Sequence, residues 1–295
     1  MLFPNPFRAE GSWFKGNLHT HTINSDGLLL PSQIAFLYQA NGYDFLSITD
    51  HRKLTDVEEL AERYENLLLI PGEEIDTGNL HLVAFNIERE IESRLSAQRI
   101  INEVSRQGGE VIVAHPYWSA LTMEDLTNIS GYLGIEVYNA TCDLSVAKGY
   151  STVHWDNLLY RGRYTYGFAV DDAHEGLSLQ RPTDTCKGWI MVKAPKLDRE
   201  SLMNSLREGL FYASTGPKIY DVQINGETIH VESSLARSVN FIARNGLGRR
   251  MFANKEPLTQ ASYTAEGNEG YIRIEVEDGK GGTAWTNPII LQEED

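Results

Sequence analysis

The stretch GNLHTHTINSDG, Gly16–Gly27, places His19 and His21 one residue apart and Asp26 five residues after them. The apolar run WFKGNL precedes the first histidine, which is typical of a buried strand. Residues two apart in a strand face the same way, so both imidazoles can reach one ion at the end of that strand. A single His-x-His pair also occurs for structural reasons alone, so the rest of the chain must decide between the two interpretations.

Seven further apolar runs follow in the first two thirds of the chain. They are YDFLSITD, LLLIPGEEI, LHLVAFN, EVIVAHP, LGIEVYN, TYGFAVDDAH and GWIMVKA. Several of these runs are continuously apolar and do not alternate between apolar and polar residues. Such runs suit strands covered on both faces, as in parallel sheets. Helical patterns are predicted between them, at residues 31–41, 56–66, 93–107, 122–133, 153–161 and 198–208. Seven or eight strand–helix units favour a barrel, regular or distorted, over an open doubly wound sheet.

The pattern changes near Tyr212, after which no convincing helix is predicted. Short strand-like runs recur instead: KIYDVQI, ETIHVE, SVNFIAR, RRMFAN, ASYTAE, YIRIEVED and AWTNPIIL. The pairs Asn225-Gly226, Asn245-Gly246 and Asp278-Gly279 supply turn residues between them. The sequence therefore predicts an α/β barrel domain over residues 1–213 and a small all-β sandwich over residues 214–295.

The composition limits the classes of partner. The formal net charge of −15 argues against a nucleic-acid backbone as the main partner, because phosphate binding needs a basic face. An acidic surface also serves solubility alone. The two cysteines are too few for a disulfide framework, which fits a reducing compartment. No signal peptide and no apolar run of membrane-spanning length is recognised, so a cytoplasmic location is predicted and the oligomeric state is left open.

Metal-ligand residue types stand at the ends of the predicted strands. Asp50 and His51 end the second run, Glu73 and Glu74 the third, His115 the fifth, and Asp172 and His174 the seventh, while His81 lies at the start of the fourth. Six of the eight histidines fall at such positions. Active sites of barrels gather where strands end, and scattered core histidines would not fall there so regularly.

Imidazoles and carboxylates together are ligands for zinc, manganese or iron. Six histidines with Asp26, Glu74 and Asp172 make nine candidate ligands. Because one ion needs only about four protein ligands, nine indicate two or three divalent ions that share a bridging carboxylate.

These residues resemble the motifs of the polymerase and histidinol phosphatase (PHP) family of metallohydrolases over nearly the whole of the first 215 residues. The matching motifs are His19-x-His21 with Asp26, Ile48-Thr49-Asp50-His51, Pro71-Gly72-Glu73-Glu74 with His81, His115-Pro116, and Asp172-Ala173-His174. Within this family, the sequence more closely resembles the branch of carbaryl-type hydrolases. The stretches that carry this resemblance are Gly134–Asn139, Trp155-Asp156, Asp171–His174, Tyr212–Pro217 and Ala284–Pro288.

The resemblance implies a distorted seven-stranded (β/α)7 TIM-like barrel with a site for two or three metal ions. By similarity, His19, His21 and Asp172 would hold one ion and Asp26, His51 and His174 a second. His81 and His115 would hold a third, with Glu74 bridging; the family pattern Gly-x-Glu selects Glu74 over Glu73. Glu74, Asp172 and His174 are the implied catalytic set.

The resemblance implies a phosphoesterase that cleaves a small phosphorylated molecule with a metal-activated hydroxide. Hydrolysis of an ester, carbamate or amide at the same site is the first alternative, and a metal-binding scaffold without activity is the second. Arg52 and Arg181 are predicted to bind substrate, against ordinary surface charges. Tyr117 and Trp118 are candidates for the wall of the pocket, against plain packing. Glu136 and Asn139 are predicted near the site, and Asp50 or Asp171 behind a histidine.

Overall fold

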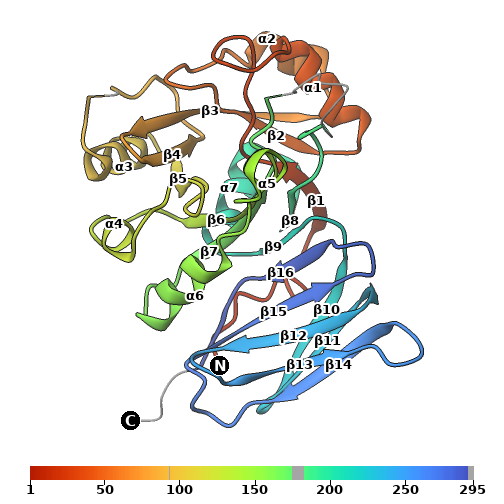
Figure 1. Ribbon diagram of the computed structural model, residues 1–295. Coiled ribbons are helices and arrows are strands. Elements are labelled where there is room, and N and C mark those ends of the chain that lie inside the picture. Colours follow the sequence, from red (N-terminus) through yellow and green to blue (C-terminus); the bar gives the residue numbers. More distant parts are fainter. Residues whose placement is uncertain (93, 175–182, 292–295) are drawn as a thin grey trace.

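The computed structural model describes residues 1–92, 94–174 and 183–291. An α/β barrel lies above a β-sandwich in Figure 1, and the N-terminal segment runs along the sandwich. The barrel strands are β1 (Ser12–Asn17), β2 (Phe45–Ile48), β3 (Leu68–Thr77), β4 (Leu80–Phe85), β5 (Glu110–Val113), β6 (Gly134–Asn139) and β7 (Tyr166–Val170). The fold class predicted from the sequence is therefore confirmed.

The barrel closes at one rim through the residues that follow β1 and β7. Thr20 forms a parallel bridge with Ala173, and the amide of Asp172 donates to the carbonyl of His19 at 2.9 Å. On its other side the same segment receives a hydrogen bond from the amide of Thr49, which follows β2. Residues 12–16 of β1 pair with β8 (Trp189–Ala194) rather than with β7, so the barrel is distorted away from this rim.

Two strands run against the direction that a regular parallel barrel predicts. β4 is antiparallel to both β3 and β5, and β8 is antiparallel to β1. β3 and β4 form a hairpin with no helix between them, and Gly78 takes a φ of 71° in its turn. Because β4 runs away from the rim, His81 at its start lies beside the residues that end β3.

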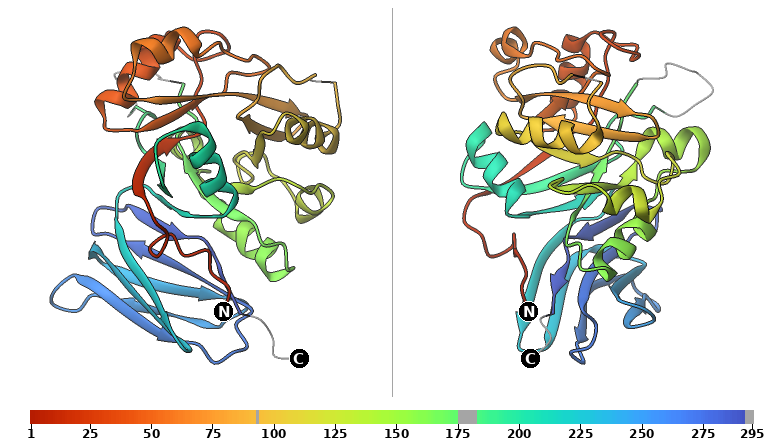
Figure 2. Two further views of the ribbon diagram at one scale, coloured as in Figure 1. Left: turned by 180° about the vertical axis from the view of Figure 1, so that it is seen from behind. Right: turned by 90° about the vertical axis from the view of Figure 1, so that its left-hand side faces the viewer.

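The helices match the predicted positions in part. They are α1 (Pro31–Ala40), α2 (Glu58–Arg63), α3 (Ala97–Arg106), α4 (Met123–Thr127), α5 (Ala140–Val146), α6 (Thr152–Tyr160) and α7 (Arg199–Arg207). The helix predicted at 122–133 ends at Thr127, and α5 had no predicted counterpart. α1 begins at Pro31, a favourable first-turn residue, and buries Ile34, Ala35 and Tyr38. Figure 2 shows the helices on the outside of the barrel sheet.

The β-sandwich continues the sheet of the barrel. Its strands are β10 (Ile219–Asn225), β11 (Thr228–Ala236), β12 (Ser238–Ala243), β13 (Gly248–Phe252), β14 (Leu258–Thr264), β15 (Tyr271–Glu277), β16 (Thr283–Thr286) and β17 (Ile289–Ile290). β9 (Phe211–Ser214) pairs with β8 on one side and β16 on the other. β10, β11 and β14 form the second layer. The predicted division at residues 213 and 214 thus falls inside a strand that both parts share.

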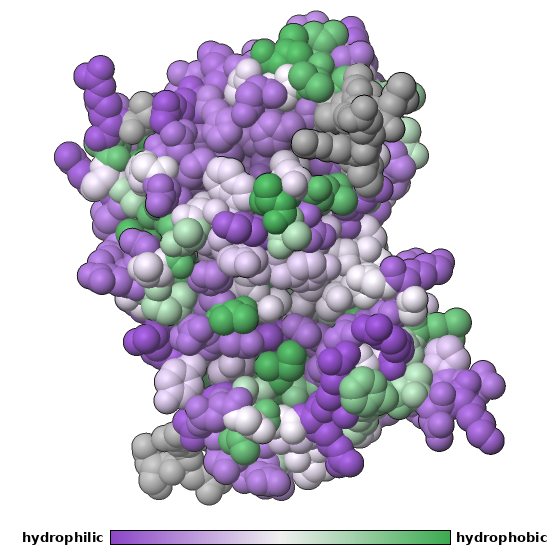
Figure 3. Space-filling view, in the orientation of Figure 1, coloured by the Kyte–Doolittle hydropathy of each residue, from purple (hydrophilic) through white to green (hydrophobic). Residues whose placement is uncertain are grey.

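Each part has its own apolar core. The barrel core is centred on buried residues of the inner strands, such as Phe45, Val113 and Phe168, and the sandwich core includes Val231 and Ile274. The face seen in Figure 3 is mainly hydrophilic, with small, separate hydrophobic patches. Within the described residues, no helix has the length and apolarity that crossing a bilayer requires.

Candidate metal centre

The rim that closes the barrel gathers all nine residues predicted as metal ligands. They form three groups, and within each group the potential ligand atoms lie within 4.8 Å of one another. The groups are His19, His21, Glu74 and Asp172; His21, Asp26, His51 and His174; and Glu74, His81 and His115. His21 and Glu74 each belong to two groups, so the three form one continuous cluster.

The central group is fully enclosed and points four ligand atoms at one another. The Nε2 atoms of His19 and His21 are 3.1 Å apart. Each lies 3.0 to 3.1 Å from Oε2 of Glu74 and from Oδ1 of Asp172. Oδ1 of Asp172 is buried, and its charged partners are the two imidazoles, at 3.1 and 3.0 Å. Two imidazole nitrogens and two carboxylate oxygens that converge in this way fit a site for a cation.

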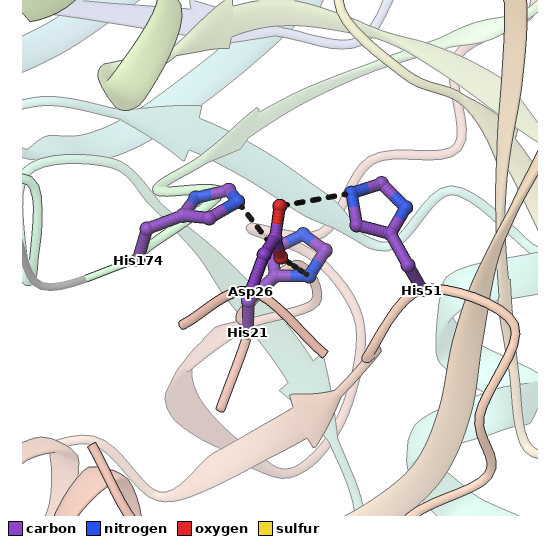
Figure 4. Close-up of side chains that lie close together, drawn as sticks. All are labelled: His21, Asp26, His51 and His174. Atoms are coloured by element: carbon purple, nitrogen blue, oxygen red, sulfur yellow. Dashed lines mark ion pairs between the residues drawn. The ribbon is translucent and has the colours of Figure 1, made fainter. Parts of the chain in front are cut away.

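The second group opens toward solvent. Oδ1 of Asp26 lies 3.6 Å from Nδ1 of His21 and 3.4 Å from Nε2 of His174. Its Oδ2 lies 3.7 Å from Nε2 of His51, so the carboxylate stands between three imidazoles (Figure 4). The side chain of Asp26 is 56% exposed, whereas His21 is completely buried. This group is therefore the part of the cluster that solvent reaches most easily.

The third group depends on the other oxygen of Glu74. Its Oε1 lies 2.8 Å from Nδ1 of His81 and 3.3 Å from Nε2 of His115. Since Oε2 of the same carboxylate faces the central group, Glu74 joins the two, as a bridging ligand would.

The carboxylates of the cluster stabilise positive charge on the groups around them. Burial opposes charge on His19, but the carboxylates of Asp172, Glu136 and Glu74 outweigh it and raise the pKa of the imidazole well above its usual value. The same balance, with Asp172 and Glu74, raises the pKa of His21 to about 9. Burial likewise opposes the charge of Glu74, yet the surrounding histidines hold its pKa well below the usual range. The cavity therefore favours cations, whether they are protons or metal ions.

Glu136 and Asn139 at the end of β6 hold the ligands in place. The carboxylate of Glu136 lies 2.6 Å from Nδ1 of His19 and accepts the backbone amide of His115 at 2.7 Å. Asn139 donates to Glu136 at 2.8 Å and to Oδ2 of Asp172 at 3.1 Å. With its Nδ1 bonded to Glu136, His19 presents Nε2 to the cluster, which is the usual arrangement behind a metal-bound histidine.

Among the described residues, Asp50 and Asp171 form hydrogen bonds to groups other than histidine, contrary to the role considered for them. Asp50 accepts hydrogen bonds from Thr22, Ser25 and Thr55 and so orders the loop that carries Asp26. Asp171 accepts from the hydroxyl of Tyr38 and from the backbone amides of residues 186–188. Both acids shape the backbone around the cluster.

Two of the candidate ligand residues adopt left-handed backbone conformations. His115 has a φ of 29° and Asp172 a φ of 54°, values that residues other than glycine rarely take. Such strain costs about 1–3 kcal/mol per residue and persists where the surroundings hold the residue in place, often at functional sites. Here the turn in the chain aims each side chain into the cluster.

A pocket of about 240 Å³ leads to the cluster. Ligand residues of all three groups line it, together with Trp118 from the loop after His115 and Thr141, Cys142 and Ser145 from α5. A pocket of this volume accommodates a small molecule.

Arg52 was predicted to bind substrate. It does not line the pocket; its guanidinium pairs with Asp76, and its side chain is 53% exposed. A role for Arg52 in binding substrate stays a prediction. Arg181 lies outside the described residues. Of the two aromatic candidates, Trp118 lines the pocket and Tyr117 does not.

Fold and cluster together define a two-domain α/β protein whose buried imidazole and carboxylate groups suit divalent metal ions. Over 94% of its length the chain has the fold of a two-domain protein from Bacteroides vulgatus that contains a predicted PHP-like metal-dependent phosphoesterase. The two share 16% sequence identity with a TM-score of 0.56, and 95% of that protein is covered. The predicted fold, a TIM-like α/β core followed by a β domain, is thereby confirmed.

Two curated proteins are similar in sequence. A 5′-3′ exoribonuclease of Haemophilus influenzae is 29% identical over 98 residues, which cover 30% of this chain and 36% of the exoribonuclease. An uncharacterised protein of Methanocaldococcus jannaschii is 26% identical over 141 residues, 43% of this chain and 82% of that protein. The chain thus aligns with only about a third of the exoribonuclease. No family model matches the chain.

Proposed function

We propose that this protein is a PHP-type metal-dependent phosphoesterase that hydrolyses a small phosphorylated molecule. The observation that carries the proposal is the convergence of nine metal-ligand side chains at one rim, in three groups linked by His21 and Glu74. The names of the similar proteins, a metal-dependent phosphoesterase and an exoribonuclease, both denote cleavage of phosphate esters and support the same chemistry.

Each group is assigned one divalent ion of manganese, zinc or iron. His19, His21 and Asp172 would hold the first, Asp26, His51 and His174 the second, and His81 and His115 the third, with Glu74 between them. When bound, such ions lower the pKa of water and offset negative charge on phosphoryl oxygens. Two ions suffice for this chemistry, so the third group is assigned an ion by its geometry alone.

The protein's own groups order this site. Glu136 keeps the proton of His19 on Nδ1, which leaves Nε2 free to serve as a ligand. Asn139 fixes the carboxylate of Asp172 through Oδ2, so that Oδ1 faces the cluster. Glu74, Asp172 and His174 all line the pocket, and we assign them as the catalytic set that meets the reacting phosphoryl group.

The substrate is proposed to be a small molecule. Apart from histidine, the described residues that line the pocket include no basic side chain, and the whole chain has a net charge of −15. A nucleic-acid backbone would find little attraction beyond the metal ions themselves.

Within this class we place the protein nearest the carbaryl-type hydrolases, on the motifs Gly134–Asn139 and Ala284–Pro288. The alternatives are therefore hydrolysis of a carbamate, ester or amide and a scaffold that binds metal without turnover.

A substrate panel separates these functions. The protein is assayed with p-nitrophenyl phosphate, bis-p-nitrophenyl phosphate and a naphthyl carbamate, with and without added manganese. We expect manganese-dependent release of p-nitrophenol from at least one phosphate ester. Release of naphthol alone would identify carbon chemistry, and no turnover by protein with verified metal content would favour the scaffold.

A further inference from the structure

Trp118 is the one large aromatic side chain among the described residues that line the pocket. It follows His115 by three residues, and its indole centroid lies 5.0 Å from the ring of His115 and 6.0 Å from that of His81. Both contacts are edge-to-face, with interplanar angles of 71° and 72°. The indole is therefore held against the imidazoles of the third group, at the border between the ligands and the open pocket.

Despite these contacts, 43% of Trp118 remains exposed. The fully buried tryptophans Trp155 and Trp285 differ, since each donates its indole N–H to a protein oxygen. A large apolar surface beside a polar cluster is costly to hydrate, and a ligand that covers it gains that free energy on binding.

The pocket wall contributed by α5 carries small, uncharged side chains. Cys142 and Ser145 are three residues apart, so they lie on one face of the helix, and both line the pocket. Burial raises the pKa of the Cys142 thiol far above its usual value, so this side chain stays neutral. The pocket lining therefore combines the imidazole and carboxylate groups of the cluster with uncharged side chains, of which Trp118 presents a flat aromatic surface.

We propose that the exposed indole of Trp118 binds a planar aromatic ring on the alcohol portion of the ester and so selects that ring. The inference rests on the proposed function for the phosphoryl end of the substrate. It specifies the substrate class as aryl, or ring-bearing, phosphate esters. Aromatic rings stack on indole with an offset or edge-on geometry that a saturated ring cannot reproduce.

Binding of two matched phosphonates tests the ring selectivity without any turnover. Phenylphosphonate and cyclohexylphosphonate carry the same anionic group and rings of similar size, but only the first is aromatic. Isothermal titration of the manganese-loaded protein should show phenylphosphonate binding about three- to tenfold more tightly, the range that aromatic pair energies imply. Cyclohexane is the more hydrophobic ring, so this preference cannot arise from burial alone.

Three variants locate the effect. Trp118→Ala should abolish the preference and leave the metal content unchanged, because Trp118 is not a ligand. Trp118→Phe should keep most of it. Tyr117→Ala is the control, since Tyr117 is adjacent and 45% exposed but does not line the pocket.

The inference is overturned if the wild type binds no phenylphosphonate, if it binds both ligands equally, or if Trp118→Ala retains the preference. Failure of the proposed function would look different, because the ester panel would show no phosphatase turnover while the phosphonate preference persisted.

Discussion

His19 and Asp172 lie at the centre of the cluster. The backbone of Asp172 is strained at a φ of 54°, and its buried Oδ1 lies 3.1 Å from His19 and 3.0 Å from His21. The backbone strain does not stabilise the fold by itself. A role for this oxygen in binding a metal ion would account for it.

Removing either ligand should remove metal and activity together. We expect His19→Ala and Asp172→Ala to lose bound metal and to lower phosphatase activity at least about a hundredfold, since even residues behind metal ligands contribute 10–100-fold. Elemental analysis and the p-nitrophenyl phosphate assay provide the measurements. His230→Ala is the matched control, because His230 lies on β11 and contacts Ser262. A ligand variant that kept both metal and activity would show that the assignment is wrong.

Glu136 should tune metal affinity through His19. Glu136→Gln keeps the size of the side chain but removes the charge beside Nδ1, so we expect metal affinity to fall about 10–100-fold. Competition with a coloured chelator measures it. Glu73→Gln is the control: Glu73 is equally buried, but it accepts the amide of Ile91 and contacts no imidazole. Equal losses in both variants would point to a general effect of burying a glutamine.

At the level of residues, the sequence predicts which side chains lie near the site but not which partners Glu136 binds there. The motifs select the nine residues that converge at the rim, because their residue types and strand-end positions are unusual together. Glu136 and Asn139 could be placed near the site, but their partners depend on the distance between β6 and β1, which are far apart in the sequence. Asp50 looked equivalent from its position beside His51, yet its neighbours are hydroxyl groups.

At the scale of elements, Asn139 joins the end of β6 to the start of α5. Its side-chain oxygen caps the helix by accepting the amide of Cys142 at 2.9 Å, while its amide group donates to Glu136 and Asp172. A single side chain thus sets the helix that lines the pocket and the carboxylate that faces the metal site.

Two substitutions of Asn139, studied in the metal-free protein, distinguish its role as a helix cap from its role as a hydrogen-bond donor to the carboxylates. Asn139→Ala loses the cap and the donated bonds, so we expect a loss of about 2–4 kcal/mol in the free energy of unfolding. Asn139→Asp keeps a capping oxygen but brings a third carboxylate against two others, so it should be at least as destabilising. Denaturant titration measures both. If the Asp variant were as stable as the wild type, the cap alone would account for Asn139.

The direction of a strand is harder to predict than its presence. All eight apolar runs of the first part form strands, but β4 and β8 run antiparallel to their neighbours. Continuous apolar runs indicate burial on both faces, but they do not indicate whether a strand runs parallel or antiparallel to its neighbours. The short turn at Gly78 was the available signal, since a parallel crossover needs about a dozen residues or more. α5 was missed because its seven residues follow β6 without an intervening loop.

At the scale of the whole molecule, Arg273 links the sandwich to the barrel. Its guanidinium is 2% exposed and binds both oxygens of Asp156 on α6, at 2.6 and 2.7 Å, as well as Glu275. It also lies 5.2 Å from the ring of Trp155, which packs against Gly167 of β7. Together with the β9–β16 pairing, this ion pair, whose guanidinium is buried, joins the two parts.

Breaking that link should destabilise the whole chain. Arg273→Ala leaves Asp156 and Glu275 without their partner, and we expect a loss of about 3–5 kcal/mol, the usual effect of breaking a buried pair. Arg237→Ala is the control, because Arg237 is 61% exposed in its pair with Glu277 and should change stability by no more than about 1 kcal/mol. Thermal unfolding followed by circular dichroism compares them. Similar midpoints for the two variants would mean that the parts hold together without Arg273.

Removal of bound metal ions should lower the stability of the barrel more than that of the sandwich. The candidate ligands follow β1, β2, β5 and β7, lie in β3 or begin β4, so bound ions would connect strands around the rim where the barrel closes. An ion present at 100 times its dissociation constant adds about 2.7 kcal/mol to the folded state, which corresponds to a rise of several degrees in the unfolding temperature. Chelation should reverse that rise and added manganese restore it, whereas His19→Ala should respond to neither. Hydrogen exchange locates the effect: the amides of His21 and Asp172, whose bonds close the barrel, should lose protection while those of β11 keep it. An unchanged midpoint after verified metal removal would show that the cluster is stable without ions, and that its strained residues serve catalysis alone.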